Sequence, residues 1–407
     1  MILRPYQSAA IDACRAHVVG GGRRPLVVAP TGAGKGEMLC AMAQKPGVLV
    51  ATTRTVLVND LRHRLRRHGS SARVVTHQAI ALAKKIPDGI KLLHVDEAHH
   101  ASSPEFLAAL EARPDLVVVG WSATPMREDG RGLSPPFDKL IETVSVRELV
   151  RQGFLVPCTV IAPKRLLKSK EIAQDPVDAW HQHARGRRTI AFCSRVDEAV
   201  KLAQSFSTAG VPATSIDGKM SAEMRELRLA AWRDGRYTVL TNVGIATEGF
   251  DEPSVTCVLL KRGANAALYL QIVGRGMRIH PGKSDMVLID LRGVTNVHGA
   301  PDEPRIFSLV GKGIRRSEGD ETRFCAICGA VLTEPGPCAE CGVGAEPWVE
   351  PKVVNEPLVR YAGMRAKSPE QKREWWEWLK AEGMRKGHKP GAAYFKYRAV
   401  MNEEPPR

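Results

Sequence analysis

Short apolar runs recur along the first 150 residues, and longer stretches of helical pattern separate them. The runs occupy residues 26–28, 48–51, 73–75, 90–95 and 116–119. Strand-length apolar runs that alternate with helices are typical of βαβ units, in which both faces of a parallel sheet are buried. The pattern predicts a doubly wound parallel-sheet domain over residues 1–150.

The same alternation resumes in the second half of the chain. Apolar runs at 189–193, 238–240, 255–260 and 286–289 are separated by helical stretches such as 196–206 and 222–232. We therefore predict a second α/β domain over residues 151–300. A length of 407 residues leaves room for a small appendage, which we divide into residues 301–350 and 351–407.

A glycine-rich turn follows the first apolar run and precedes a helix start. Its sequence is Ala-Pro-Thr-Gly-Ala-Gly-Lys-Gly over residues 29–36. Free backbone N–H groups and the helix dipole would converge there on a phosphate chain, with Lys35 between the outer phosphates. Gly36 stands where this P-loop pattern normally has a magnesium-ligating serine or threonine. An ordinary glycine-rich turn is the alternative interpretation.

Polar residues follow several of the other predicted strands. Asp96 and Glu97 come directly after the run at 90–95. Downstream of a P-loop, Asp96 would hold Mg²⁺ through its water shell, and Glu97 would orient and deprotonate the attacking water. The carboxyl ends of parallel strands are where ligands bind in open α/β sheets, so these tips are candidate site positions.

The motifs together resemble those of a superfamily-two helicase of the DEAH type. Residues 30–35, 96–99 and 122–125 match its motifs I, II and III in order, and residues 3–7 resemble its adenine-reading segment. In the second half, residues 192–195, 241–251 and 271–278 resemble motifs IV, V and VI. The resemblance implies two tandem RecA-like domains and an ATPase driven by nucleic acid.

The family resemblance also implies a role for each matching position. Nucleotide binding falls to Arg4, Gln7, Thr31, Gly32, Ala33, Gly34, Lys35, Gly36, Gly249 and Asp251, and catalysis to Lys35, Asp96, Glu97, Gln271, Arg275 and Arg278. Nucleic acid would contact Thr53, Arg54, Thr76, His77, Ser194 and Thr241, while His99, Ser122 and Thr124 would couple the two sites. On a helix, Arg275 and Arg278 would share a face and clamp a γ-phosphate across a cleft.

The net charge of the chain indicates what kind of partner it binds. A formal net charge of +15 favours a polyanion, of which nucleic acid is the commonest. DNA is preferred over RNA because the motifs look closer to those of DNA-repair and restriction helicases. We further expect a cytoplasmic monomer without a membrane segment; protein partners are not predicted.

Four of the nine cysteines are clustered in two pairs near residue 330. Cys325, Cys328, Cys338 and Cys341 form two C-x-x-C knuckles, each followed by glycine. Four thiolates in this spacing predict a structural zinc ribbon. An iron–sulfur cluster or unligated cysteines are the alternatives.

Aromatic residues are concentrated in the last 40 positions. We expect Trp375, Trp376 and Trp378 to form the core of a small helical region. For the basic and aromatic stretch 386–398, core packing and stacking on bases are equally supported.

Three functions remain open on the sequence alone. The first is an ATP-dependent DNA helicase or translocase, and the second is a duplex translocase that does not separate strands. The third is a nucleic-acid-binding scaffold with an impaired ATP site, for which Gly36 is the supporting feature.

Overall fold

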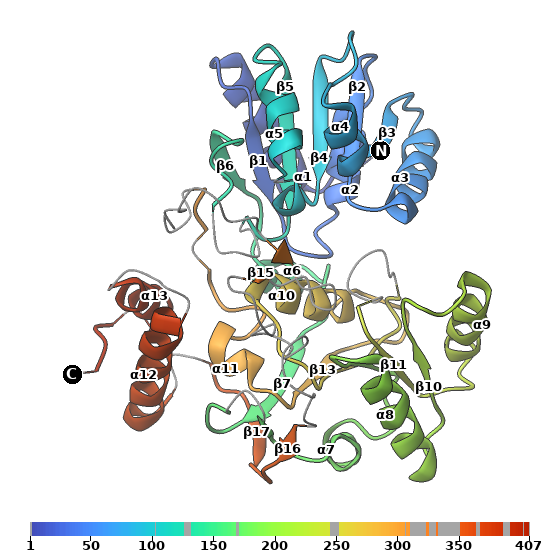
Figure 1. The fold of residues 1–407 in the computed structure, drawn as a ribbon, viewed down its shortest axis with the longest axis vertical. Coiled ribbons are helices and arrows are strands. Elements are labelled where there is room, and N and C mark those ends of the chain that lie inside the picture. The colour runs from blue at the N-terminus through green and yellow to red at the C-terminus, as the bar shows by residue number, and fades with distance from the viewer. Residues whose placement is uncertain are drawn as a thin grey trace. The chain divides into compact units, whose positions relative to one another are not determined.

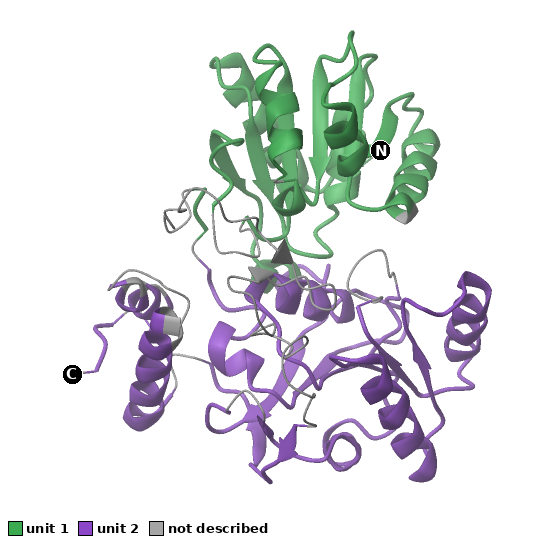
Figure 2. Ribbon diagram, in the orientation of Figure 1, with its two compact units in different colours: residues 1–149, 307–315 green, residues 150–306, 316–407 purple. Residues whose placement is uncertain are grey.

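The structure is a computed structural model that divides into two compact units (Figure 2). Unit 1 comprises residues 1–149 and 307–315, and unit 2 comprises residues 150–306 and 316–407. The described residues are 2–406 apart from 102, 126–131, 168–170, 245–251, 306, 310–322, 325–330, 333–350, 364–366, 386–390 and 402.

Unit 1 is built from alternating strands and helices (Figure 1). Its elements are α1 (Pro5–Val19), β1 (Pro25–Val28), α2 (Lys35–Met42), β2 (Val48–Thr52), α3 (Thr55–Arg67), β3 (Arg73–Thr76), α4 (His77–Ala83), β4 (Leu92–Asp96), η1 (Ala98–His100), α5 (Pro104–Glu111), β5 (Val117–Ser122), β6 (Lys139–Glu142) and α6 (Val146–Arg151), the last of which crosses into unit 2.

The strands of unit 1 form one parallel sheet in the order β3-β2-β4-β5-β1-β6. Strands β1 and β2 are buried along their whole length because helices cover both faces. Phe307 and Leu309, which follow residues 150–306 of unit 2 in the chain, pack against this core. The backbone N–H of Ser134 donates to the carbonyl of Leu309 (3.1 Å). The doubly wound fold predicted for this half is confirmed.

Unit 2 repeats the architecture with a second sheet. Its elements are β7 (Cys158–Pro163), β8 (Glu171–Ile172), α7 (Pro176–His183), β9 (Thr189–Phe192), α8 (Val196–Thr208), β10 (Ala213–Ile216), α9 (Ala222–Arg233), β11 (Val239–Asn242), β12 (Cys257–Leu260), α10 (Ala266–Gly276), β13 (Met286–Asp290), α11 (Val294–His298), β14 (Arg323–Phe324), β15 (Val331–Leu332), β16 (Lys352–Val353), β17 (Leu358–Arg360), α12 (Pro369–Arg385) and α13 (Ala392–Met401).

The main sheet of unit 2 has the order β10-β11-β9-β12-β13-β7-β17. All its neighbours are parallel except β17, which runs antiparallel to β7. Residues 352–360, predicted as the start of a helical tail, instead supply two strands to this unit. Apolar alternation over three residues is too short a signal to identify such an edge strand from sequence.

The tryptophan-rich end of the chain forms a small helical cluster. Trp375 and Tyr397 are fully buried, with ring centroids 5.2 Å apart. Trp376 and Trp378 are partly buried against the same cluster, as are Leu166 and Tyr361 of unit 2. The prediction that the tryptophans serve as core is confirmed for Trp375, while Trp376 and Trp378 pack at the margin of the cluster.

Candidate nucleotide-binding site

The P-loop takes the conformation that its glycines predict. It follows β1 and opens α2, and Gly32 and Gly34 have φ values of 90° and 80°. Only glycine adopts such angles without strain. Lys35 is the first residue of α2, and its Nζ donates to the carbonyl of Ala29 (3.4 Å). The loop therefore presents free N–H groups and a fixed ammonium at a helix N-terminus, which is an anion site.

Residues of α1 hold the P-loop from the side. The Nε2 of Gln7 and the hydroxyl of Tyr6 both donate to the carbonyl of Ala33, at 2.9 Å each. The Oε1 of Gln7 accepts from the N–H of Arg4 (2.9 Å). A side chain at Gly34 would meet Gln7 Nε2 at 2.4 Å. Gln7 is thus buried against the P-loop, a contact that its predicted adenine-reading role did not include.

The acidic pair lies at the end of β4. Asp96 ends this strand, and its Oδ2 accepts from the hydroxyl of Thr52 (3.3 Å). Burial raises the pKa of Asp96, the neighbouring charge of Glu97 raises it further, and Lys35 lowers it. A carboxylate held beside a like charge in a desolvated position gains stability from a cation. The donor set therefore fits the magnesium ion expected with a nucleotide.

Glu97 itself sits in a strained backbone conformation. Its φ of 48° and ψ of 53° are left-handed, which is uncommon for a residue with a side chain. Such strain concentrates at functional positions. Glu97 Oε2 lies 3.6 Å from His99 Nδ1.

His99 connects this acidic tip to the end of β5. It is buried, and its Nδ1 lies 3.0 Å from the Oγ of Ser122. Ser122 in turn donates to the carbonyl of Thr124 (2.6 Å) and accepts from its N–H (3.1 Å). The three residues predicted to couple the two sites form one continuous hydrogen-bonded chain.

Arg64 fills the space beside Gly36 of the P-loop. A Cβ on residue 36 would lie 2.5 Å from Nη1 of Arg64, which belongs to α3. Arg64 pairs with Asp60 at 3.3 Å and lies 3.9 Å from Glu37. A guanidinium therefore occupies the space beside the position where the usual hydroxyl side chain would stand.

The residues predicted to contact nucleic acid lie at strand ends, but not all are accessible. Thr53 and Arg54 follow β2, and Thr76 ends the adjacent strand β3, where it caps α4. The Oγ1 of Thr53 is buried without a hydrogen-bond partner among the described residues. His77 is buried as well, with its ring 5.5 Å from that of Phe106. Burial lowers its pKa to about 4.

Two of the corresponding positions lie on unit 2. The N–H of Ser194 donates to Glu198 (2.9 Å) at the end of β9. Thr241 is fully buried, and its hydroxyl donates to the carbonyl of Ala199 (2.7 Å). Burial of His77 at the start of α4 and of Thr241 within β11 could not be predicted from the sequence, because a polar residue at either place can point inward or outward. The geometry does not provide a direct nucleic-acid contact at these two side chains.

One prediction about the arginine pair is wrong in its geometry. Helix α10 ends at Gly276, so Arg275 lies in its last turn while Arg278 lies beyond it. Arg278 forms an isolated β-bridge with Leu155 instead of continuing the helix. A Cβ on Gly276 would meet Val258 at 2.9 Å, so the helix end is packed tightly on the sheet and the chain turns away. The two arginines do not share a helix face.

Gln271, predicted as catalytic, is buried within α10. The other predicted positions lie outside the described residues. These are Gly249 and Asp251 of the nucleotide set and the four cysteines Cys325, Cys328, Cys338 and Cys341. Among the described residues, no group of three or more histidine, cysteine or acidic side chains could hold a metal ion. The described helices also include none that is long and apolar enough to cross a membrane.

Sequence reasoning missed three members of the site. Thr52 and Tyr6 were not selected because their contacts to Asp96 and Ala33 join distant parts of the chain. Arg64 belongs to a basic helical stretch in which the sequence does not single out one arginine. Only the tertiary fold identifies these three.

Parts of the chain are similar to known proteins. The family described as "Helicase conserved C-terminal domain" matches residues 170–280. The putative mitochondrial ATP-dependent helicase irc3 of Schizosaccharomyces pombe is 27% identical over 71% of this chain and 57% of its own length. A 51.5 kDa protein of a Lactococcus phage is 25% identical over 75% of each chain.

A solved structure gives the fold comparison. The ATP-dependent Type ISP restriction-modification enzyme LlaBIII bound to DNA matches with a TM-score of 0.53 and 17% identity, over 71% of this chain and 28% of that one. The chain thus spans little more than half of the yeast relative and under a third of the restriction enzyme. The fold and motifs of the chain are therefore similar to those of superfamily-two helicases, and the match to the helicase C-terminal domain is confined to residues 170–280.

Proposed function

We propose that the protein is an ATP-dependent helicase or translocase that acts on DNA. The observation that carries this proposal is that the P-loop after β1 and the acidic pair after β4 lie at the carboxyl edge of one parallel sheet, where burial raises the pKa of Asp96 and the charge of Lys35 lowers it. Lys35 begins α2 and Asp96 ends β4, so the two side chains come from distant parts of the chain, and phosphate binding and hydrolysis need both charges in one place.

The residues of unit 1 divide the chemistry among themselves. Lys35 and the N–H groups of the P-loop bind the phosphate chain. Magnesium, when bound at Asp96 with the nucleotide, supplies charge neutralisation. Glu97 accepts the proton of the attacking water, and the hydrogen-bonded chain of His99, Ser122 and Thr124 positions it.

We assign a transition-state role to the arginines of motif VI. Arginine fingers in other nucleotide hydrolases contribute about 10³–10⁵ in rate. Arg275→Ala should therefore lower the turnover number far more than it lowers nucleotide affinity. Equal losses of both would assign Arg275 to ground-state binding.

DNA is the proposed track. The net charge of +15 supports a polyanionic partner, and LlaBIII, which shares the fold, was solved bound to DNA. The test is steady-state ATP hydrolysis with single-stranded DNA, duplex DNA and RNA, with Lys35→Ala as the control. Stimulation by DNA that is lost in the control supports a DNA motor, whereas stimulation by RNA alone contradicts it.

A second assay separates movement from strand separation. Displacement of a triplex-forming strand reports translocation along a duplex, and release of a paired strand reports unwinding. Activity only in the first assay would favour a duplex translocase. Tight DNA binding without hydrolysis above the Lys35→Ala level would favour the scaffold.

We also propose a structural zinc ribbon at the four clustered cysteines. Their two C-x-x-C pairs suit tetrahedral thiolate ligation. Elemental analysis of the purified protein should find one zinc per chain, and Cys325→Ser should lower that content. Iron in place of zinc would indicate a cluster instead.

A further inference from the structure

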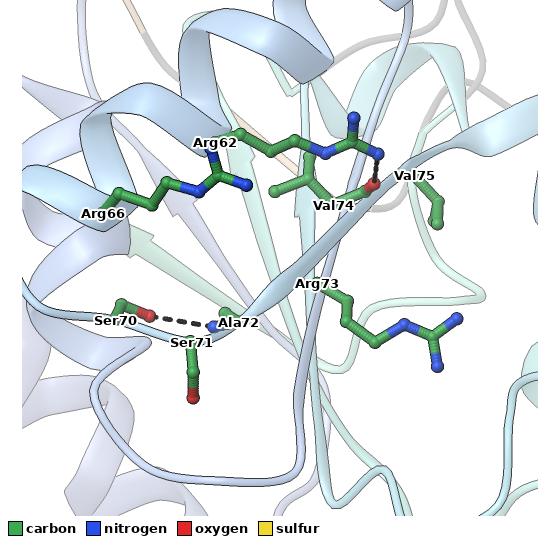
Figure 3. Close-up of a pocket in the computed structure, with 8 residues that line it drawn as sticks. All are labelled: Arg62, Arg66, Ser70, Ser71, Ala72, Arg73, Val74 and Val75. Carbon is green, nitrogen blue, oxygen red and sulfur yellow. Dashed lines mark hydrogen bonds between the residues drawn. The ribbon is translucent and has the colours of Figure 1, made fainter.

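We propose that a basic pocket between α3 and β3 binds phosphate groups of a nucleic-acid backbone, as a contact additional to the motor motifs. The pocket has a volume of about 390 Å³. Figure 3 shows its lining, in which Arg62 and Arg66 come from α3 and Arg73 from the start of β3. Ser70, Ser71 and Ala72 form the loop between these two elements.

The three arginines carry charge that unit 1 does not balance. Arg62 and Arg66 are separated by one helical turn, an arrangement in which like charges destabilise a helix. Within the part of the chain that the structure describes, no carboxylate pairs with Arg62, Arg66 or Arg73. Asp60, the nearest acid along the helix, pairs with Arg64. The site therefore has uncompensated positive charge around a cavity, which an anion would relieve.

The geometry suits a polyanion better than a small apolar ligand. Arg62 is anchored because its Nη2 donates to the carbonyl of Val74 (3.0 Å). Arg66, Arg73 and Ser71 are exposed, so their donors can reach a ligand from outside. Ser70, by contrast, is buried and hydrogen-bonded to Ala43 and Ala72, which fixes the loop.

The pocket is distinct from the nucleotide site. β3 is an edge strand, and four strand spacings separate it from β1, which carries the P-loop. That separation corresponds to about 19 Å. In addition, Arg73 begins β3, so the pocket lies toward the amino ends of the parallel strands, whereas the P-loop follows the carboxyl end of β1.

Charged residues on an edge strand can also serve to prevent aggregation by strand pairing. That role would account for Arg73 alone. It does not require Arg62 and Arg66 of α3 to line the same cavity. A nucleic acid that extends past the edge of unit 1 would meet all three.

The test compares two variants that lose the same charge. Arg66→Ala with Arg73→Ala removes two exposed guanidinium groups and leaves Arg62, whose Nη2 donates to the carbonyl of Val74, in place. The control combines Arg67→Ala, exposed on α3 outside the pocket, with Lys139→Ala on the opposite edge strand β6. Binding to labelled duplex and single-stranded DNA is measured by anisotropy over a range of salt concentrations.

We expect the pocket variant to bind DNA roughly tenfold more weakly, with a salt-dependence slope lower by about 1.8 for duplex DNA. ATP hydrolysis without DNA and the melting temperature should match the native protein. Equal affinities and slopes in the pocket and control variants would overturn the proposal.

This inference rests on the proposed function only for the identity of the ligand. Absence of DNA binding by the native protein would contradict the proposed function itself, whereas native binding with an unaffected pocket variant would overturn the pocket alone. Pyrophosphate binding by calorimetry distinguishes the source of the phosphate. Pyrophosphate binding that the pocket variant loses, with DNA affinity unchanged, would identify a small-anion site and overturn the nucleic-acid assignment.

Discussion

Two carboxylates, one in each unit, occupy similar places at the carboxyl edge of a parallel sheet but have opposite environments. Asp96 in unit 1 lies beside the like charge of Glu97, and burial and that charge raise its pKa. Glu198 in unit 2 is buried too, but it accepts from Nζ of Lys261 (2.5 Å) and from the N–H of Ser194 (2.9 Å). In unit 2 a lysine therefore bonds directly to the carboxylate, whereas the hydrogen bond to the carboxylate of Asp96 in unit 1 comes from the neutral hydroxyl of Thr52.

The difference separates a site from a structural pair. A buried ion pair with full hydrogen bonding holds its sheet edge together and needs no ligand. The acidic tip of unit 1 also has a strained backbone at Glu97, with a φ of 48°. Two adjacent carboxyl groups and a strained backbone at one sheet edge mark the place where binding of a ligand is most favourable.

Of the substitutions that test this difference between the two carboxylates, we expect that of Asp96 to have the largest effect on activity. Asp96→Asn removes the charge that holds the magnesium ion, and we expect ATP hydrolysis to fall by at least about 10²-fold. The same substitution relieves repulsion with Glu97, so the melting temperature should not fall. Hydrolysis assays and calorimetry on one preparation check both outcomes; a clear loss of stability would assign Asp96 a structural role.

Substitution of Glu198 should have the reverse signature. Glu198→Gln leaves Lys261 buried without its counter-charge, and loss of one partner of a buried pair costs about 3–5 kcal/mol. Denaturant unfolding measures this loss. The double variant Glu198→Gln with Lys261→Met should recover much of it, because no charge is then left buried. Failure of the double variant to recover would contradict the pairing as the source of stability.

The contrast also shows what sequence could predict. The apolar runs, the P-loop and the acidic tip are local patterns, and the two parallel sheets follow from them. Contacts such as Tyr6 and Gln7 on Ala33 join distant segments, so no local pattern specifies them. The arginine pair failed for a related reason: the end of α10 at Gly276 depends on packing against β12, which spacing along the chain does not reveal.

Acid should destabilise unit 1 through its buried histidines. Burial lowers the pKa of His94 to about 3, and burial with the charge of His100 lowers that of His77 to about 4. Because the unfolded chain then binds more protons, stability is complete above the ordinary pKa of 6.5 and falls as the pH decreases toward the folded values. Each histidine contributes up to about 1.4 kcal/mol per pH unit.

Two variants sharpen this expectation. His94→Gln retains an acceptor for the Nε1–H of Trp121, which donates to His94 at 3.0 Å, and should reduce the loss of melting temperature between about pH 7 and pH 5. The raised pKa of Asp96 acts in the opposite sense, so Asp96→Asn should steepen that loss. If the melting temperatures of the native protein and both variants changed equally with pH, neither His94 nor Asp96 would be a source of the pH dependence.

The smallest effect is expected at Gly36. A serine there would bring its Cβ within 2.5 Å of Arg64 Nη1, the far end of a flexible side chain that can move aside. We expect the free energy of unfolding to change by less than about 1 kcal/mol. Since magnesium normally keeps several waters, a water can replace the missing hydroxyl, and the turnover number should change by less than about threefold.

Hydrolysis by Gly36→Ser, with Arg64→Ala as the control for the displaced arginine, tests this directly. If the native protein hydrolyses ATP and the serine variant is similar, the P-loop is complete without the hydroxyl because water and Asp96 supply the ligands. If instead the native protein is inactive and the serine variant gains activity, Gly36 has disabled the site. The charge imbalance at Asp96 would then serve nucleotide binding without turnover, and the scaffold interpretation would replace the motor.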